Sequence, residues 1–445
     1  MSNITTYMNR FATTLITTIF LSASASAQIY SLPQCIDYAL AHNTGYASAQ
    51  LEKQKQELTV QQARASYLPT LSGQAEHNFN QGRSLDVTTN EYSEKSYQNG
   101  SAGLVAGADL FKGFQRRYNS SLQQHQLDLQ MSQIEIARNQ LALDVADAYM
   151  QALFATESAA SAQLQLDITS AEVAKMQVLA DAGVRRKADI LRLQAQLESE
   201  RAELLYQQGQ SEGYLLRLKQ LMEFKADTAA TAPFGIVTAL ESATVPVLLP
   251  ADSAFAGAKT LPELVAADMR IRSAEEQVNI SKSYRSPQLS AHASYGMQYS
   301  TRDADPIGTQ MGNNRNAQFG VRLTVPIFNQ YQTKTAISRS QIDVLQAQSA
   351  KVETEKDLRN RIQSTYLNAK AAQQRLDAAQ KSADFYAESF RIAQAQLEAG
   401  AVNALDFSNE KTALAVAQAR VISIRYELLY HSLMLNYFAT GTVSL

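Results

Sequence analysis

The sequence predicts a mainly helical protein that also contributes β-strands to a membrane β-barrel shared between subunits. Three observations predict it: the chain is duplicated, each copy carries two strands of alternating polarity, and each copy carries a helix far longer than a globular domain needs. The chain has 445 residues, 45% of them hydrophobic and 18% charged, which is enough for a large core. Its formal net charge is -2, so the chain lacks the excess positive charge that electrostatic binding to nucleic acid requires.

The N-terminus has the pattern of a secretory signal. Arg10 precedes an apolar run from Phe11 to Leu21 and small residues follow, so we expect a signal peptide over residues 1–27. A buried helix is the alternative interpretation of the same run. After Ala27 no apolar run is long enough for a membrane helix, so membrane contact would need a closed barrel. The single cysteine, Cys35, excludes an internal disulfide, and we interpret it as a buried helix residue.

The chain is built from two copies of one module. Four pairs of like residues are each separated by 217 positions, and equal spacing requires elements of equal length in both copies. We expect a first repeat of helix, strand, strand, helix and helix over residues 28–223, a linker or equatorial segment over 224–261, and a second repeat with the C-terminus over 262–445. The pairs are Phe111 and Phe328, Tyr149 and Tyr366, Gly183 and Gly400, and Asp189 and Asp406.

Each copy contains candidate strands in which apolar and polar residues alternate. The period of two persists over about ten residues, a length that suits a tilted strand of a membrane barrel. Two soluble hairpins packed on helices would show the same alternation. Four strands cannot close a barrel, since membrane barrels begin at about eight, so the barrel would be shared. The apolar positions are Leu71, Gly73, Ala75, His77 and Phe79 in the first strand, Leu289, Ala291, Ala293, Tyr295, Met297 and Tyr299 in its counterpart, and Phe319, Val321, Leu323, Val325 and Ile327 in the return strand over residues 318–327.

Polar segments connect the paired strands. Residues 81–96 and 301–316 are rich in Asn, Asp, Ser, Thr and Gly, the composition of loops that face solvent. We place both loops outside the cell.

The second part of the prediction concerns the helices, one of which is very long and has two apolar stripes. Residues 112–182 contain no proline and only Gly113 near their start, so they form one helix of about 70 residues and ~105 Å. Two heptad stripes on nearly opposite flanks indicate a neighbour on each side, as in a stave of a cylinder wall, with a solid bundle as the alternative. Residues 34–67 and 189–222 predict helices of half that length. The stripes are Leu122, Leu129, Ile136, Leu143 and Met150, and Leu127, Ile134, Leu141 and Ala148.

With these features in place, the chain resembles the TolC family of outer membrane factors (outer membrane efflux proteins) over essentially everything after residue 27. Each motif is weak singly, but their duplicated order is specific. The motifs are Tyr67-Leu68-Pro69-Thr70-Leu71 before the first strand, Leu110-Phe111-Lys112-Gly113-Phe114 and Ile327-Phe328-Asn329-Gln330-Tyr331 after the return strands, and Ala-Gly turns at residues 182–191 and 399–407.

The resemblance implies a homotrimer in the outer membrane of a Gram-negative bacterium, with a long periplasmic extension. Three subunits would give one twelve-stranded barrel and a coiled-coil barrel of twelve helical columns. It further implies an exit duct of a tripartite efflux system, which carries small molecules from the periplasm outward with a periplasmic adaptor and an inner-membrane transporter. The alternatives are the outlet of a type I protein secretion system and, as a less favoured one, a structural coiled-coil surface protein. The transporter selects the cargo, so the sequence of the duct leaves the substrate open.

The two Ala-Gly turns form the periplasmic tip and a gate in that family. Gly183 and Gly400 suit left-handed positions that end a helix, whereas Asp189 and Asp406 begin the next helix, where a carboxylate caps free N–H groups. Capping and a gating role both fit these aspartates. By resemblance Asp406 matches one acidic ring of the entrance, while Asn409 occupies the position of a second.

Two further features separate this tip from the best-known members. Leu397 and Val402 stand where a polar tether would hold the closed form, so we do not expect that lock. The first turn is basic, with Arg185, Arg186 and Lys187, which fits either an acidic adaptor surface or a solvated charge run.

The sequence lacks the patterns of an enzyme. Five dispersed histidines show no metal-ligand spacing, and neither a phosphate-binding glycine loop nor a nucleophile elbow is present. We therefore predict no catalytic, cofactor or metal site, and outer-membrane lipid rather than nucleic acid as a contact. A periplasmic enzyme with an unrecognised site is the remaining alternative.

Overall fold

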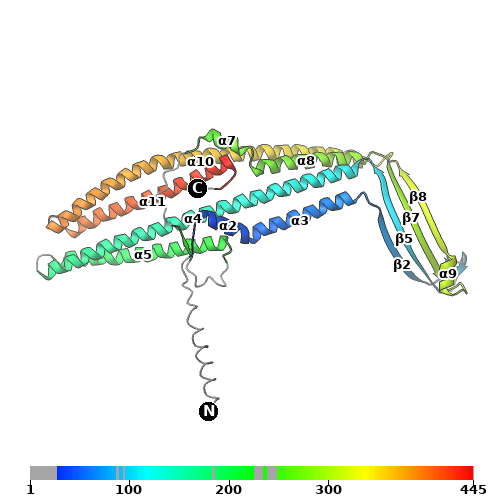
Figure 1. Ribbon diagram of the computed structural model, residues 1–445, viewed down its shortest axis with the longest axis horizontal. Helices are drawn as coiled ribbons and strands as arrows, with labels where there is room; N and C mark the ends of the chain where they lie inside the picture. The colour runs from blue at the N-terminus through cyan, green and yellow to red at the C-terminus, as the bar shows by residue number, and fades with distance from the viewer. Residues whose placement is uncertain are drawn as a thin grey trace, which may run out of the picture. The chain divides into compact units, whose positions relative to one another are not determined.

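The computed structural model describes residues 28–86, 90–93, 96–182, 186–224, 234–237 and 248–443 (Figure 1). The expected signal peptide and parts of the 224–261 linker lie outside these residues. The chain forms two compact units. One contains residues 48–136 and 259–360, and the other contains residues 1–47, 137–258 and 361–445. Each unit therefore combines segments from the first and second halves of the chain.

The first unit contains a four-stranded antiparallel sheet in the order β2, β5, β7, β8 (Figure 1). The strands are β2 (Thr70–Asn80), β5 (Tyr97–Lys112), β7 (Gln288–Ser300) and β8 (Arg315–Thr324). The pair β5 and β7 at the centre joins the two halves of the chain. Within the described residues, β2 and β8 each have a strand partner on one side only.

The register of the sheet separates apolar from polar residues, as the alternation predicted. Directly paired residues in an antiparallel sheet share a face. One face is lined by Leu71, Ala75, Ala102, Leu104, Ala106, Ala293, Tyr295, Met297, Phe319, Val321 and Leu323. The other is lined mainly by polar and small residues, among them Ser72, Gln74, Glu76, Ser101, Ser290, His292, Ser294, Gln318 and Arg322.

The return strand and the two loops differ in detail from the prediction. β8 ends at Thr324 rather than residue 327, because Pro326 lacks the N–H group that a ladder requires. The first loop contains a small hairpin of β3 (Ser84–Asp86) and β4 (Glu91–Ser93). The second contains α9 (Ile307–Asn313), which the buried side chain of Gln310 holds through bonds to the backbone of Ser300, Asp303 and Asp305.

Two very long helices confirm the main helical prediction. α4 (Gln115–Asp181) has 67 residues and α10 (Gln332–Ala399) has 68. Both heptad stripes of α4 supply buried residues. The shorter helices are α3 (Thr44–Ala65), α5 (Lys187–Leu221), α8 (Pro262–Ser283) and α11 (Ala404–Thr440). The buried stripe residues of α4 are Leu122, Leu143 and Met150 from one stripe, and Ile134 and Ala148 from the other.

The helix expected over residues 34–67 is two helices. α2 (Leu32–His42) ends at Asn43, whose backbone is extended, with φ -66° and ψ 122°, and α3 follows. The Asn43 side chain accepts a hydrogen bond from the Tyr46 N–H at 3.0 Å and donates one to the Leu221 carbonyl at 3.3 Å. Cys35 is completely buried in α2, as predicted, and burial raises the pKa of its thiol to about 12.

The described parts of the linker fold onto the second unit. β6 (Phe234–Ile236) pairs in parallel with β1 (Gln28–Tyr30). The Tyr149 hydroxyl lies within hydrogen-bond distance of two carbonyls, that of Tyr30 at the end of β1 and that of Val237 just after β6, and donates to them. α7 (Ala251–Ala258) packs on α11. None of the helices in the described part of the chain combines the length and the apolar composition needed to cross a membrane.

Candidate functional site

The turn between α10 and α11 has the geometry that its glycine predicts. Gly400 has a φ of 78°, in the left-handed region. Its N–H bonds to the Leu397 carbonyl at 3.1 Å, and the Ala401 N–H bonds to the Gln396 carbonyl at 2.8 Å. These two bonds make a Schellman motif, which ends a helix by satisfying its last carbonyls. Gly183 and Arg185, in the equivalent turn, lie outside the described residues.

Neither aspartate caps its helix, which corrects the sequence interpretation. Asn403 is the N-cap of α11, and its side-chain oxygen accepts from the N–H groups of Leu405 at 2.8 Å and Asp406 at 3.0 Å. The N-cap residue must have a non-helical backbone, whereas Asp406 is already inside the helix. On α5 the N-cap is Arg186, without a side-chain bond, and Asp189 lies in the first turn. Both carboxylates still favour the positive end of the helix dipole.

The described tip residues are placed at the beginnings of α5 and α11. Arg186 and Lys187 are exposed, and Asp189 is half-buried. Asp406 and Asn409 are exposed on the first two turns of α11. All five side chains can therefore meet solvent or another molecule.

An apolar cluster joins the four helices beside these turns. Leu397, 2% exposed, is part of it, and Val402 packs against it. The rings of Phe390 and Phe407 lie 5.5 Å apart. Leu397 and Val402, the two positions at which the resemblance implies a polar tether, thus contribute to apolar packing. The buried members are Met176, Ile190, Leu193, Leu397, Ala404 and Phe407.

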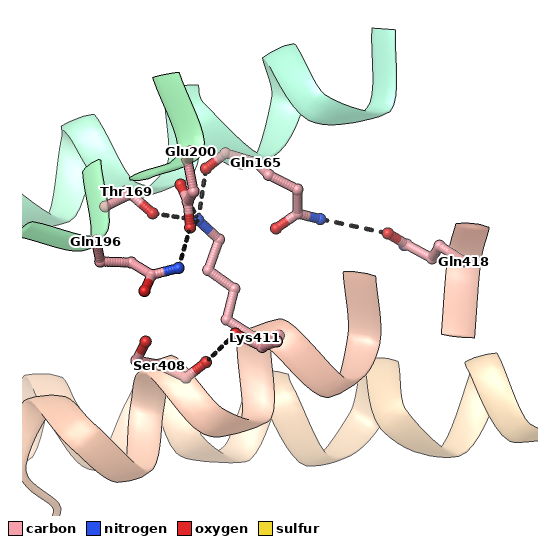
Figure 2. A network of polar contacts seen from close by, with 8 residues as sticks. Gln165, Thr169, Gln196, Glu200, Ser408, Lys411 and Gln418 are labelled. Carbon is pink, nitrogen blue, oxygen red and sulfur yellow. Dashed lines mark hydrogen bonds and ion pairs between the residues drawn. The ribbon is translucent and has the colours of Figure 1, made fainter. Parts of the chain in front are cut away.

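One turn beyond this cluster, Lys411 of α11 forms a buried polar contact (Figure 2). Its ammonium donates to the Gln165 carbonyl at 2.5 Å, to the Thr169 hydroxyl, and to both carboxylate oxygens of Glu200 at 2.9 Å. Burial lowers the pKa of Lys411, and the hydrogen bond to Glu200 opposes that shift.

Sequence reasoning did not identify Lys411. The only signal is its position: it lies between Phe407 and Leu414, two members of the apolar stripe of α11. A charge in such a stripe indicates a partner on the facing helix, but the partner cannot be named from the sequence.

Further polar contacts link α4 to α10 and α11. Lys175 and Glu398 form an exposed ion pair at 2.7 Å. Glu157 accepts from the Tyr426 hydroxyl at 2.7 Å and from Arg425 at 3.2 Å. Burial and the nearby Glu157 carboxylate raise the pKa of Tyr426. Among the described residues, no group of three or more His, Cys, Asp or Glu side chains is arranged to hold a metal ion.

Solved structures of outer-membrane channels share this fold. The chain is similar to the outer membrane protein VceC from Vibrio cholerae, with 17% identity, a TM-score of 0.75 and coverage of 93% of this chain and 97% of that one. The CmeC outer membrane channel of Campylobacter jejuni has 16% identity, a TM-score of 0.75 and coverage of 93% and 86%. A membrane protein from Pseudomonas aeruginosa has 19% identity, a TM-score of 0.76 and coverage of 92% and 90%. The fold is thus that of the TolC-like outer-membrane channels.

The family follows from the sequence itself. The family described as outer membrane efflux protein matches residues 35–222 and 259–440. The chain belongs to this family, which confirms the predicted resemblance and the localisation to the outer membrane of a Gram-negative bacterium with a long periplasmic extension. The family is defined by efflux and not by catalysis. No relative was found among curated protein sequences.

Proposed function

We propose that this protein is the outer-membrane exit duct of a tripartite efflux system, which exports small molecules from the periplasm. The observation that carries the proposal is the sheet of β2, β5, β7 and β8, with one apolar and one mainly polar face and an unpaired edge on each side among the described residues. The apolar face suits outer-membrane lipid and the polar face suits a wet lumen.

The proposed assembly is a homotrimer. Three sheets joined edge to edge, β8 of one subunit to β2 of the next, give a twelve-stranded barrel, and closure removes every open edge. Exposed apolar side chains spaced by seven residues also call for a neighbouring helix. In the unit with the four-stranded sheet they are Leu51 and Leu58 on α3 and Leu345 and Val352 on α10; in the other unit they are Phe385 and Ile392 on α10.

The proposed contact with a periplasmic adaptor lies at the helix turns. Arg186 and Lys187, exposed at the start of α5 and preceded in sequence by Arg185, suit an acidic surface of the adaptor. Asp406 and Asn409 are proposed to face the entrance that leads toward the inner-membrane transporter. Gly183 and Gly400 are the proposed turning points, and Asp189 belongs to the same tip.

Catalysis has no part in the proposal. Export through a duct requires a wide wet path and a gate, while the energy and the choice of cargo come from the transporter. An outlet for type I protein secretion would use the same path, so the two roles differ in their partners and in what leaves the cell.

The first experiment measures the mass and the single-channel conductance of the detergent-extracted mature protein. A trimer that forms pores in planar bilayers supports the duct, whereas a monomer without conductance overturns it. Deletion of the gene then separates the two cargo classes. Increased sensitivity to small toxic compounds supports efflux, and loss of a secreted protein with unchanged sensitivity supports secretion.

A further inference from the structure

The apolar face of the four-stranded sheet carries a single charged side chain among its paired positions. Arg315, the first residue of β8, pairs directly with Met297 of β7 and therefore shares the face of Met297 and Tyr295. A charge on a lipid-facing strand is strongly unfavourable at the middle of the membrane and is tolerated near its surfaces. The other charged residues at paired positions of this sheet are on the polar face, and they are Glu76, Asp109, Lys112 and Arg322.

Arg315 lies at the outer end of the sheet. β8 begins shortly after α9, whereas its other end leads to α10, and the long helices extend into the periplasm (Figure 1). From Leu289 to Tyr299, β7 covers about 34 Å at ~3.4 Å per residue, which a tilt of ~40° converts to about 26 Å of height. The apolar band of a membrane barrel is about 25 Å tall and is bordered by aromatic residues. Tyr299 therefore lies at the outer membrane surface, and Arg315 lies one row below it.

A histidine and a tyrosine form a polar pair at the same outer end. The His77 Nδ1 and the Tyr299 hydroxyl are 2.7 Å apart, and their rings are inclined by only 20°. Gly100 of β5 lies between them and is paired with both residues. A Cβ atom on Gly100 would be 2.5 Å from the Tyr299 ring, so the missing side chain allows this ring to lie across β5 and reach His77.

The pair keeps an outward proton donor in either direction of its hydrogen bond. If the Tyr299 hydroxyl donates to Nδ1, the neutral imidazole carries its proton at Nε2; if Nδ1 donates, the hydroxyl proton is left over. The side chains of His77 and Arg315 are both exposed. Within the described part of the chain, the Arg315 guanidinium has neither an ion pair nor a hydrogen bond. These donors are therefore available to an anion from outside the chain.

A phosphate group attached to a lipid fits this arrangement. The guanidinium of Arg315 binds phosphate through two parallel hydrogen bonds, and its long side chain can extend from its row toward the headgroups. Arg315 and Tyr299 are diagonal neighbours on adjacent strands, about 7–8 Å apart at their Cβ atoms, so one headgroup spans both. Tyr295, Met297 and Phe319 continue the same face toward the membrane centre, where acyl chains would cover them. A free phosphate ion would leave that apolar surface unused.

We propose that Arg315 and the pair of His77 and Tyr299 bind the phosphate groups of an outer-leaflet lipid, whose acyl chains lie on the apolar rows below. The inference rests on the proposed function, because it requires the apolar face to contact the outer membrane, and it goes further by naming the headgroup chemistry. In the proposed trimer β8 adjoins β2 of the next subunit, which brings a second His77 to the same face beside Arg315.

The test measures the binding of lipid A, a phosphorylated outer-leaflet lipid, to the detergent-extracted mature protein by native mass spectrometry. Dephosphorylated lipid A and inorganic phosphate are the comparison ligands. We expect dephosphorylated lipid A to bind at least about tenfold more weakly, because it lacks the charge that Arg315 would meet. Inorganic phosphate at the concentration of the lipid should not displace lipid A, because it makes no contact with the apolar rows.

Three variants assign the binding to named side chains. Arg315→Gln should weaken lipid A binding at least about tenfold, and Arg315→Lys should be intermediate, because it keeps the charge but loses the two-pronged contact. His77→Phe combined with Tyr299→Phe keeps both rings but removes their donors, and should weaken binding several-fold. Arg322→Gln is the matched control, since it removes the same charge from the polar face of the same strand and should leave lipid A binding unchanged.

The outcomes separate the lipid site from the duct. Unchanged binding in Arg315→Gln, an equal loss in Arg322→Gln, or displacement of lipid A by inorganic phosphate would overturn the lipid site. Conductance in planar bilayers is measured on the same wild-type preparation. A protein that forms pores but does not prefer the phosphorylated lipid keeps the duct and overturns the site, whereas Arg315-dependent binding without pores keeps the site and overturns the duct.

Discussion

Gly257 of α7 lies directly against the backbone of Ala439 of α11. A Cβ atom on Gly257 would be 2.1 Å from the Ala439 carbonyl oxygen and 2.7 Å from its Cα. No side chain fits there without moving one helix. This contact seats a part of the linker on the end of α11.

Gly257→Ala should therefore destabilise the protein. Overpacking a close helix contact costs about 1–3 kcal/mol, and we expect a lower thermal midpoint of the detergent-extracted protein. Gly209→Ala in α5 is the matched control, because nothing lies within 4 Å of its added Cβ. There the better helix propensity of alanine should raise stability by up to about 1 kcal/mol. Equal midpoints for the two variants would contradict the close contact.

Asn403→Ala should destabilise the start of α11. It removes the acceptor for two N–H groups, a loss that typically costs about 1 kcal/mol. Thermal unfolding and amide exchange at Leu405 and Asp406 measure it. Asn409→Ala, exposed within the helix, is the control for stability. If Asn409→Ala leaves stability unchanged but alters conductance, its role concerns the entrance and not the helix end.

Gly400→Ala should loosen the second turn. An L-residue in the left-handed region costs about 1–2 kcal/mol, and asparagine tolerates that region better than alanine. We expect faster amide exchange at Gly400 and Ala401 in Gly400→Ala, with Gly400→Asn intermediate. Identical exchange in all three proteins would show that the turn does not depend on its left-handed residue.

His431 should make stability depend on pH. Burial lowers its pKa from the ordinary value of 6.5, while Glu427 opposes this shift. The unfolded chain then binds a proton more readily than the folded one, so stability is full above pH 6.5 and falls as the pH drops below it toward the folded pKa. Thermal midpoints between pH 7.5 and 5.5 should decline more in the wild type than in His431→Gln. A decline of equal size in both would exclude His431 as its source.

The sequence could predict the elements whose signals repeat along the chain. Heptads without proline gave α4 to within a few residues, the duplication gave a second very long helix, now seen as α10, and alternation gave the two faces of the sheet. Alternation failed at Val325 and Ile327, because it follows only side-chain polarity, whereas Pro326, which lacks a backbone N–H, is the sequence signal that the strand ends earlier. The break at Asn43 was missed because one polar residue between two helical patterns looks like any exposed helix position.

Contacts between distant segments were beyond reach of the same reasoning. Lys411 meets Gln165 and Glu200, which lie 246 and 211 residues earlier in the chain. Only the folded arrangement brings them together. A local example is the N-cap of α11. Asn403 and Asp406 are both residue types that suit a helix start, so the sequence alone could not choose between them; the backbone conformation shows that Asn403 is the cap.

The pairing of β5 with β7 has a consequence for biosynthesis. The two central strands lie about 190 positions apart in the chain, so the first half emerges from the export machinery with β5 open along the edge that β7 will occupy. Long-range pairing of this kind is slow and leaves the incomplete chain exposed to aggregation. The first half therefore carries an unpaired β5 edge until the second half has crossed into the periplasm, and we expect a shortage of periplasmic chaperones to lower the yield of folded protein.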